Sequence, residues 1–191
     1  MSILSQVAIV LNRPQDPVNI AATVRVMKNF GFVDLRLVQP VAYDPWRIEG
    51  VAHGTRDLVE RIRHFDTLED AVADCVYVAA FGAKRRAHRW PVTDPRALAP
   101  VMLEKAASGR VALLFGQEDH GLPNDAIDRG DVLVRIPTTE HASLNVAQAV
   151  NVAAYELHVA AGDATREVAR HKHHAALPKK DEWERALGDI D

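Results

Sequence analysis

The sequence predicts an α/β protein in which helices flank a mostly parallel sheet. Five short apolar runs are nearly continuous in Val, Leu, Ile and Ala, without regular alternation with polar residues. This pattern is typical of parallel strands that are covered on both faces. Helical stretches separate the runs, and strand–helix alternation indicates an α/β sheet. The strands are predicted at Gln6–Leu11, Leu35–Val38, Val76–Ala80, Val111–Phe115 and Val132–Ile136.

The helices are expected between these strands. The first has clear boundaries, because Asp16 is a good N-cap and Pro17 suits the first helical position. Its free backbone N–H groups would form a natural anion site. A weaker helical pattern covers Trp46–Glu60, and a short strand is expected around Arg61–Phe65. Stronger helical patterns predict helices at Pro17–Phe30, Leu68–Asp74, Asp94–Ala107, Asn124–Arg129 and Leu144–Ala161.

Length and composition favour a soluble globular protein. The chain has 191 residues, of which 48% are hydrophobic and 26% charged. We assign residues 1–162 to one domain and 163–191 to a polar, weakly helical tail. The first residues lack a basic leader and a long apolar run, so we expect no signal peptide and no membrane contact. The lone Cys75 lies in an apolar run, and we expect a buried, inert thiol in a reducing cytoplasm.

Charge gives a mixed indication about nucleic acid. The net charge of −3 argues against a protein that coats nucleic acid by charge alone. A charge run is ordinarily a solvated loop, but an aromatic residue beside it favours nucleic acid. One such run is present, and it consists of Lys84, Arg85, Arg86, His88 and Arg89, followed by Trp90.

The first candidate site is the start of the first predicted helix. Arg25 lies one turn after Ala21 and Ala22, and helical side chains lean back toward the N-terminus. These small residues leave room for the guanidinium to reach the anion-binding end, where a fork of donors suits phosphate. A surface arginine or a structural ion pair explains Arg25 equally well.

The second candidate site is the segment Phe115–Leu122, which follows a buried strand. Gly116 permits close backbone approach and Gly121 a sharp turn, at the sheet edge where parallel strands bind ligands. The acids and the histidine within it are either an acid–base set or a polar turn. No glycine precedes Gly31, so neither a GxGxxG loop nor a P-loop follows the first strand. This excludes the ordinary dinucleotide fold and the common Rossmann-type methyltransferase.

The third candidate site is the segment Ile136–Asn145, which leads into the last long helix. Ser143 is expected to be the N-cap of that helix. The helix is apolar almost all round, and its polar exceptions form one stripe that needs partners. A subunit interface, an active site or internal hydrogen bonds would supply them. The stripe consists of Asn145, Gln148, Asn151 and Tyr155.

Three histidines in the tail raise the question of a metal site. No carboxylate or cysteine stands at ligand spacing from them, so we predict no bound metal. The three are His171, His173 and His174.

Taken together, three segments resemble the motifs of the SpoU/TrmH-like branch of the SPOUT RNA methyltransferases. They occur in the family order and cover nearly the whole domain. The third looks most like the branch that acts on the anticodon loop of transfer RNA. The motifs are Asn19–Arg25 with Met27–Gly31, then Leu114–Leu122, then Ile136–Pro137 with Ser143–Val150 and Ala154–Leu157.

The resemblance implies a fold, an assembly and a cofactor. The C-terminal part of the α/β domain would be tied in a deep trefoil knot, a rare exception among folds. The protein would be a homodimer whose site combines residues of both subunits. The knotted loops would hold S-adenosyl-L-methionine in a bent shape, largely through backbone contacts. The matching residues are Ala80, Phe81, Gly82, Gly116, Ile136, Pro137, Ser143, Leu144 and Asn145.

The implied reaction is methyl transfer to a ribose 2′-hydroxyl, with transfer RNA as the favoured substrate. In this family Arg25 would take the hydroxyl proton or hold the neighbouring phosphate. An arginine pKa above about 12 makes a poor base, so we favour positioning. Asn19, Glu118 and Asn145 would orient Arg25 and the ribose, and Ser143 would lie beside the cofactor. RNA contacts are expected from Arg13, Arg25, Lys84, Arg85, Arg86 and Arg89.

Two departures from the family pattern motivate rival hypotheses. Ala21 replaces a frequent glycine, and Gln117 and Asp119 stand where arginines are frequent, which lowers the positive charge near the substrate. The chain could therefore be a catalytically silent, knotted RNA-binding scaffold, or a methyltransferase of bases or small molecules. Retention of Arg25 and of Glu118 with Asn145 favours the RNA-methylating enzyme.

Overall fold

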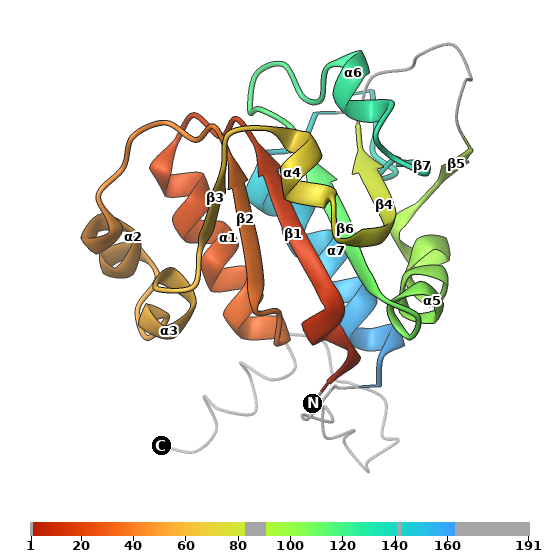
Figure 1. Cartoon of the computed structure of the whole chain (residues 1–191), viewed down its shortest axis with the longest axis horizontal. Coiled ribbons are helices and arrows are strands. Elements are labelled where there is room, and N and C mark those ends of the chain that lie inside the picture. The colour runs from red at the N-terminus through yellow and green to blue at the C-terminus, as the bar shows by residue number, and fades with distance from the viewer. Residues whose placement is uncertain (1, 83–90, 141–142, 163–191) are drawn as a thin grey trace, which may run out of the picture.

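A seven-stranded, wholly parallel sheet forms the centre of the fold (Figure 1). The structure, a computed structural model, describes residues 2–82, 91–140 and 143–162. The strand order is β3-β2-β1-β6-β4-β7-β5. The strands are β1 (Val7–Asn12), β2 (Asp34–Val38), β3 (Arg63–Phe65), β4 (Cys75–Phe81), β5 (Val92–Thr93), β6 (Arg110–Phe115) and β7 (Val132–Val134).

Helices cover both faces of the sheet, as the sequence predicts. One core cluster joins α1, α5 and α7 to side chains such as Ile9 and Leu113. The other joins α4 and α6 to the alternate side chains Val10 and Leu114. None of the helices in the described ranges is long and apolar enough to cross a membrane. They are η1 (Ile3–Gln6), α1 (Pro17–Phe30), α2 (Pro45–Val51), α3 (Arg56–Val59), α4 (Leu68–Val72), α5 (Pro95–Ala106), α6 (Asn124–Ile127) and α7 (Val146–Ala160).

The first helix begins where its sequence signals place it. Pro17 is its first residue, and the side chain of Asp16 accepts a 2.8 Å hydrogen bond from the amide of Val18. The weaker helical pattern at Trp46–Glu60 is two short helices: α2 ends at Val51 with Ala52 as its C-cap, and Gly54 at φ +72° lies in the turn before α3. The strand expected around Arg61–Phe65 is confirmed as β3. Sequence periodicity did not reveal the short elements η1 and β5.

The prediction that Ser143 caps the last helix is wrong. The helix begins at Val146, and Asn145 is the N-cap, whose side chain accepts hydrogen bonds from the amides of Ala147 and Gln148. Serine and asparagine are comparably good caps, so residue type alone does not choose between them. Asn145 is favoured here because its side-chain amide also bonds to Asn19 on α1.

A buried ion cluster lies at the amino ends of the strands. Asp34, which is 7% exposed, accepts hydrogen bonds from the guanidinium groups of Arg36, Arg63 and Arg110. Arg36 is 1% exposed and also bonds to Asp74, just before β4. Burial alone would raise the pKa of Asp34. The hydrogen bonds and charges of the arginines outweigh this effect and hold that pKa below its ordinary value. This cluster therefore stabilises the sheet edge opposite the ligand-binding edge.

The lone thiol fits a structural role. Cys75 is half-buried at the start of β4, and burial raises its pKa to about 11. A thiol with so high a pKa stays protonated at neutral pH and is a poor nucleophile. The basic run at 84–89, the histidines at 171–174 and the tail from residue 163 lie outside the described residues.

Candidate functional site

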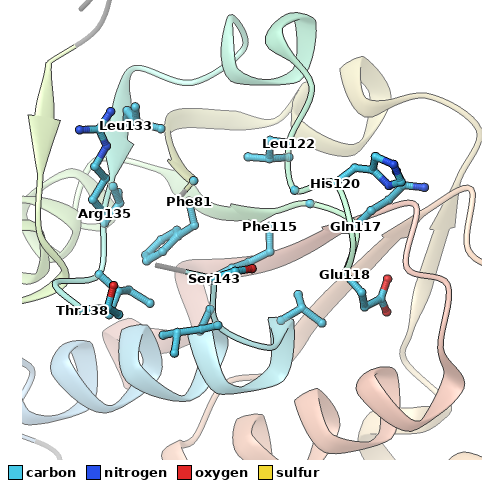
Figure 2. A pocket seen from close by; sticks show the side chains of 18 of the residues that line it. Phe81, Phe115, Gln117, Glu118, His120, Leu122, Leu133, Arg135, Thr138 and Ser143 are labelled. Atoms are coloured by element: carbon cyan, nitrogen blue, oxygen red, sulfur yellow. The ribbon is translucent and has the colours of Figure 1, made fainter. Parts of the chain in front are cut away.

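The main cavity, of about 740 Å³, lies at the carboxyl ends of β4, β6 and β7. Its volume is in the range of small-molecule and cofactor sites. Figure 2 shows Phe81 and Phe115 at its centre, with Glu118 on one side and Arg135 on the other. The two phenyl rings are stacked, with centroids 4.4 Å apart. The cavity thus has an aromatic floor and a polar rim, at the edge where parallel sheets bind ligands.

Most of the residues predicted to hold a cofactor line this cavity. Two do not. Ala80 is fully buried, and its side chain belongs to the core on the opposite face. Asn145 caps α7 and faces Asn19. Consecutive strand residues face opposite sides, so Phe81 and Ala80 cannot both point toward one cavity. The predicted residues that line it are Phe81, Gly82, Gly116, Ile136, Pro137, Ser143 and Leu144.

The loop after β6 folds tightly back on itself. A Cβ atom on Gly116 would lie 2.2 Å from the backbone carbon of Gly121 and 2.3 Å from the amide nitrogen of Leu122. Gly121 has φ +66° and donates a 2.9 Å hydrogen bond to the carbonyl of Gln117. Only glycine fits at Gly116, because two backbone segments touch there. This close contact positions Gln117 and Glu118 at the cavity rim.

A chain of hydrogen bonds joins the three motif segments. The carboxylate of Glu118 accepts bonds from the amides of Gln15 (3.0 Å) and Asp16 (3.2 Å) and from Nδ2 of Asn19 (3.0 Å). Oδ1 of Asn19 in turn accepts a 2.8 Å bond from Nδ2 of Asn145. The sequence predicts that Asn19, Glu118 and Asn145 work together, and the structure brings these three side chains into contact.

The anion site expected before α1 is filled from within the protein. The amide groups of Gln15 and Asp16, just before the helix, donate hydrogen bonds to the carboxylate of Glu118. Burial alone would raise the pKa of Glu118, but hydrogen bonds from Asn19 and from backbone amides hold it below its ordinary value. Glu118 is therefore ionised at neutral pH, and its lone pairs are already engaged. It suits a positioning role better than that of a general base.

Arg25 lies apart from this network. Its Nη1 donates a 2.6 Å hydrogen bond to the carbonyl of His53, in the loop between α2 and α3. The prediction that Asn19, Glu118 and Asn145 orient Arg25 does not match this geometry, because their polar atoms bond to one another. The small side chains of Ala21 and Ala22 do not fix the direction of the Arg25 side chain. Nothing in the sequence predicts its contact with His53.

Arg135 is a cavity residue that the sequence pattern did not reveal. It was included in a strand predicted to reach Ile136, but β7 ends at Val134, and both Arg135 and Ile136 line the cavity. Figure 2 shows the Arg135 side chain at the cavity margin beside Leu133. One signal could have found it: Arg135 is the polar residue directly after the apolar run Val132–Val134, and ligands bind where parallel strands end.

No metal centre is evident in the described part of the chain. Among those residues, no group of three His, Cys, Asp or Glu side chains is placed to hold an ion.

Comparison with known proteins agrees with the motif resemblance. The model of the SpoU rRNA Methylase family matches residues 6–155. The tRNA (cytidine/uridine/adenosine-2′-O-)-methyltransferase TrmJ of Pseudomonas aeruginosa is 40% identical over 159 residues. That alignment covers 82% of this chain and 62% of the relative, so the chain spans less than two thirds of that protein.

Solved structures agree with the same fold. TrmJ from Z. mobilis ZM4 superposes with a TM-score of 0.73 and 37% identity, covering 79% of this chain and 67% of that one. The AdoMet-bound rRNA methyltransferase from Sinorhizobium meliloti superposes with a TM-score of 0.60 and 26% identity, covering 81% and 56%.

Proposed function

Because this chain belongs to the SpoU rRNA methylase family, we propose that it transfers a methyl group from S-adenosyl-L-methionine to a ribose 2′-hydroxyl of transfer RNA. The observation that carries the proposal is the hydrogen-bonded set Glu118–Asn19–Asn145, which ties all three motif segments together beside the main cavity. Transfer RNA is favoured because the relative from Pseudomonas aeruginosa is named for that substrate. We also propose that the protein works in the cytoplasm.

The main cavity suits S-adenosyl-L-methionine. Its stacked phenyl rings and its aliphatic side chains, such as Leu122 and Leu133, offer a flat apolar bed for an adenine ring. Gly82 and Gly116 keep the walls free of side chains at two points. A structural neighbour was solved with AdoMet bound. We propose Phe81, Gly82, Gly116, Ile136, Pro137, Ser143 and Leu144 as the residues that hold the cofactor.

The cofactor supplies an electrophilic methyl group on a sulfonium. The protein's tasks are to align the ribose and to let the hydroxyl proton pass to solvent water as the oxygen–carbon bond forms and the carbon–sulfur bond breaks. Ser143 lines the cavity and would lie beside the reacting hydroxyl. Arg25 would hold the neighbouring phosphate. A guanidinium carries five N–H donors, and the carbonyl of His53 anchors it through Nη1, leaving further donors for the RNA.

We further propose a homodimer that uses the exposed faces of α1 and α7. These helices pack side by side, with Asn19 near Asn145 at one end and Phe30 near Tyr155 at the other. Tyr155 and Val159 on α7 are half-exposed, and Val18 on α1 is 57% exposed. Such apolar exposure on adjacent helices is typical of a subunit interface. Light scattering of the purified protein tests the dimer, and Tyr155→Glu should shift it toward the monomer.

We also propose that the C-terminal part of the chain is tied in a trefoil knot. Support comes from the sheet order, in which β7 lies beyond β4 while α7 returns to pack against α1 and α5 near the middle of the fold. Pulling the two ends apart in a single-molecule experiment tests this. A knotted chain reaches a shorter extended length than 191 residues allow, and an unknotted chain reaches the full length.

The decisive experiment for the reaction uses labelled S-adenosyl-L-methionine and transfer RNA transcripts. Label should appear in dinucleotides that resist alkali, because a 2′-O-methyl group blocks cleavage at that ribose. Label in alkali-sensitive RNA would indicate a base methyltransferase. Binding of RNA without binding of the cofactor would indicate a silent scaffold. Either result would contradict the proposed reaction.

A further inference from the structure

A second cavity, of about 170 Å³, lies at the same sheet edge as the main cavity but shares no lining residue with it. It occupies the carboxyl ends of β1, β2 and β3, whose loops Figure 1 shows at the upper edge of the sheet. Arg13 and Gln39, the first residues after β1 and β2, form one wall. Asp66 and residues of α4 and α6 form the others.

Arg13 and Gln39 share an unusual backbone conformation. Their φ angles are 56° and 44°, and among the described residues they are the two non-glycine residues with positive φ. Side chains of L-amino acids disfavour this region, and strained backbone that persists is concentrated at functional sites. The two positions are matched, because Asn12 and Val38, which precede them, pair in the parallel sheet. Each strand thus ends in the same left-handed turn.

The matched turns bring the two side chains together. Nε of Arg13 donates a 3.1 Å hydrogen bond to Oε1 of Gln39, and Nε2 of Gln39 donates a 2.6 Å bond to the carbonyl of Asp66. The guanidinium is therefore fixed at its Nε edge. Within the described part of the chain, no hydrogen bond or ion pair engages its two Nη groups. The planar guanidinium of Arg13 thus lies at the cavity wall, held through Nε, with the N–H donors of its two Nη groups available to a ligand.

The charge of the lining favours a neutral ligand over a phosphate. Arg13 and Arg129 supply two positive charges, whereas Asp66, Glu69 and Asp125 supply three negative ones. Arg129 is moreover paired with Glu69. A phosphate would meet net negative charge. A nucleobase carries both donors and acceptors on its edges and a face that stacks on guanidinium planes, so it matches this lining.

We propose that the second cavity binds one unpaired nucleobase of the RNA substrate, next to the methylated nucleotide. Arg13 would stack on the base or donate to it, and a carboxylate of the opposite wall would accept from its amino or imino group. This inference rests on the proposed function. The two cavities are close together, since Gln15, bonded to Glu118 of the main cavity, is two residues from Arg13, at most about 7 Å along the chain.

The test combines protein variants with abasic RNA. After the methylated position is mapped, each flanking nucleotide of the transcript is replaced by an abasic one, and steady-state methyl transfer is measured. For the unmodified protein, one flanking abasic site should raise KM for RNA about tenfold, the effect of one lost base contact. Arg13→Ala should raise KM for intact RNA similarly, with no further loss at that abasic site. The kcat value and the affinity for S-adenosyl-L-methionine should not change.

Two further variants separate recognition from charge and folding. Lys105→Ala removes one positive charge at the last turn of α5, near the amino end of β6, and should behave as the unmodified protein with every RNA. Gln39→Gly removes the amide that holds Arg13 while allowing the positive φ, so it should fold and yet lose the abasic effect.

Three results would overturn the inference. The first is an unchanged KM for RNA in Arg13→Ala. The second is an equal rise of that KM in Arg13→Ala and Lys105→Ala. The third is a rise of KM with the abasic RNA that persists in Arg13→Ala. Complete absence of methyl transfer by the unmodified protein would overturn the proposed function as well. If methyl transfer occurs but does not depend on Arg13, only the proposal of a nucleobase site in the second cavity is overturned.

Discussion

The carboxylate of Glu118 accepts a 3.0 Å hydrogen bond from Nδ2 of Asn19, although 98 residues separate them in the chain. Asn19 is 7% exposed on the first turn of α1, and Glu118 follows β6 at the cavity rim. The bond fixes the loop after β6 against the start of α1. Because Glu118 lines the main cavity, loss of this contact should alter the shape of that cavity.

Glu118→Gln should destabilise the protein and weaken cofactor binding. It replaces a carboxylate that accepts three N–H bonds with a neutral amide, which we expect to cost about 2 kcal/mol. The pKa of Glu118 is lowered in the fold, so its contribution is complete above its ordinary pKa and is lost as pH falls through the lowered pKa. Urea unfolding from pH 7 to pH 3 should show a smaller loss of stability in Glu118→Gln. An unchanged acid dependence would contradict this account.

Gly116→Ala should disrupt the tight loop after β6. The new Cβ would lie 2.2 to 2.4 Å from backbone atoms of Gly121 and Leu122, which cannot move aside independently. We expect a loss of about 3 kcal/mol and no measurable cofactor binding by calorimetry. Gly50→Ala is the matched control. No atom lies within 4 Å of its Cβ position in α2, so it should be neutral or stabilising. Cofactor binding by Gly116→Ala would refute the role of the close backbone contact.

Arg25→Ala should abolish methyl transfer while leaving the fold and cofactor binding intact. Its guanidinium contacts the carbonyl of His53 and lies outside the cavity lining. We expect kcat to fall at least about a hundredfold, the usual range for a group that acts on the transition state. Arg25→Lys should recover little, because lysine lacks the forked donors. Arg96→Ala, which removes an exposed arginine of α5 that pairs with Glu156 on α7, serves as the control. Full activity of Arg25→Ala would remove Arg25 from the mechanism.

Asp34→Asn should be among the most destabilising single substitutions outside the site. It weakens the partner of three arginines, and a buried ion pair broken on one side costs about 3 kcal/mol or more. Asp57→Asn breaks the exposed pair with Lys28 and should reduce stability far less than Asp34→Asn does. Because the pKa of Asp34 is lowered, its stabilising effect declines only in acid, as pH falls below its ordinary value. Denaturant titrations at pH 7 compare the two losses of stability, and titrations at pH values below 3.8 test the acid dependence of Asp34.

Gln39→Gly should slightly stabilise the protein. Gln39 has a left-handed backbone conformation, which costs a non-glycine residue about 1 to 2 kcal/mol, and glycine removes this strain. Glycine also loses more backbone entropy on folding, which costs about 0.5 to 1 kcal/mol. The net gain of about 0.5 kcal/mol would appear as a higher midpoint in urea. A loss larger than 1 kcal/mol would mean that the side-chain bonds to Arg13 and Asp66 outweigh the backbone strain.

Much of the fold was accessible from the sequence, because its signals are local. Continuous apolar runs identified the buried parallel strands, and Asp16 with Pro17 identified the start of α1. The boundary at β7 and the cap of α7 were misjudged. Both depend on contacts between distant segments, such as that of Asn145 with Asn19, which no local pattern encodes.

The candidate site was only partly accessible for the same reason. The motif segments predicted which loops meet, and seven of the nine predicted cofactor residues line one cavity. The direction of a long side chain is not fixed by spacing, so the contact between Arg25 and His53 was missed. The matched turns at Arg13 and Gln39 were likewise invisible, because neither residue type favours positive φ.

The bond from Asn145 to Asn19 also sets the order in which this protein can mature. Strands β1 to β6 are synthesised before residue 145, so the cavity wall at Ser143 and Leu144 is fixed against α1 only after Asn145 has been added. A chain truncated before α7 would contain most of the sheet and yet be unable to bind its methyl donor.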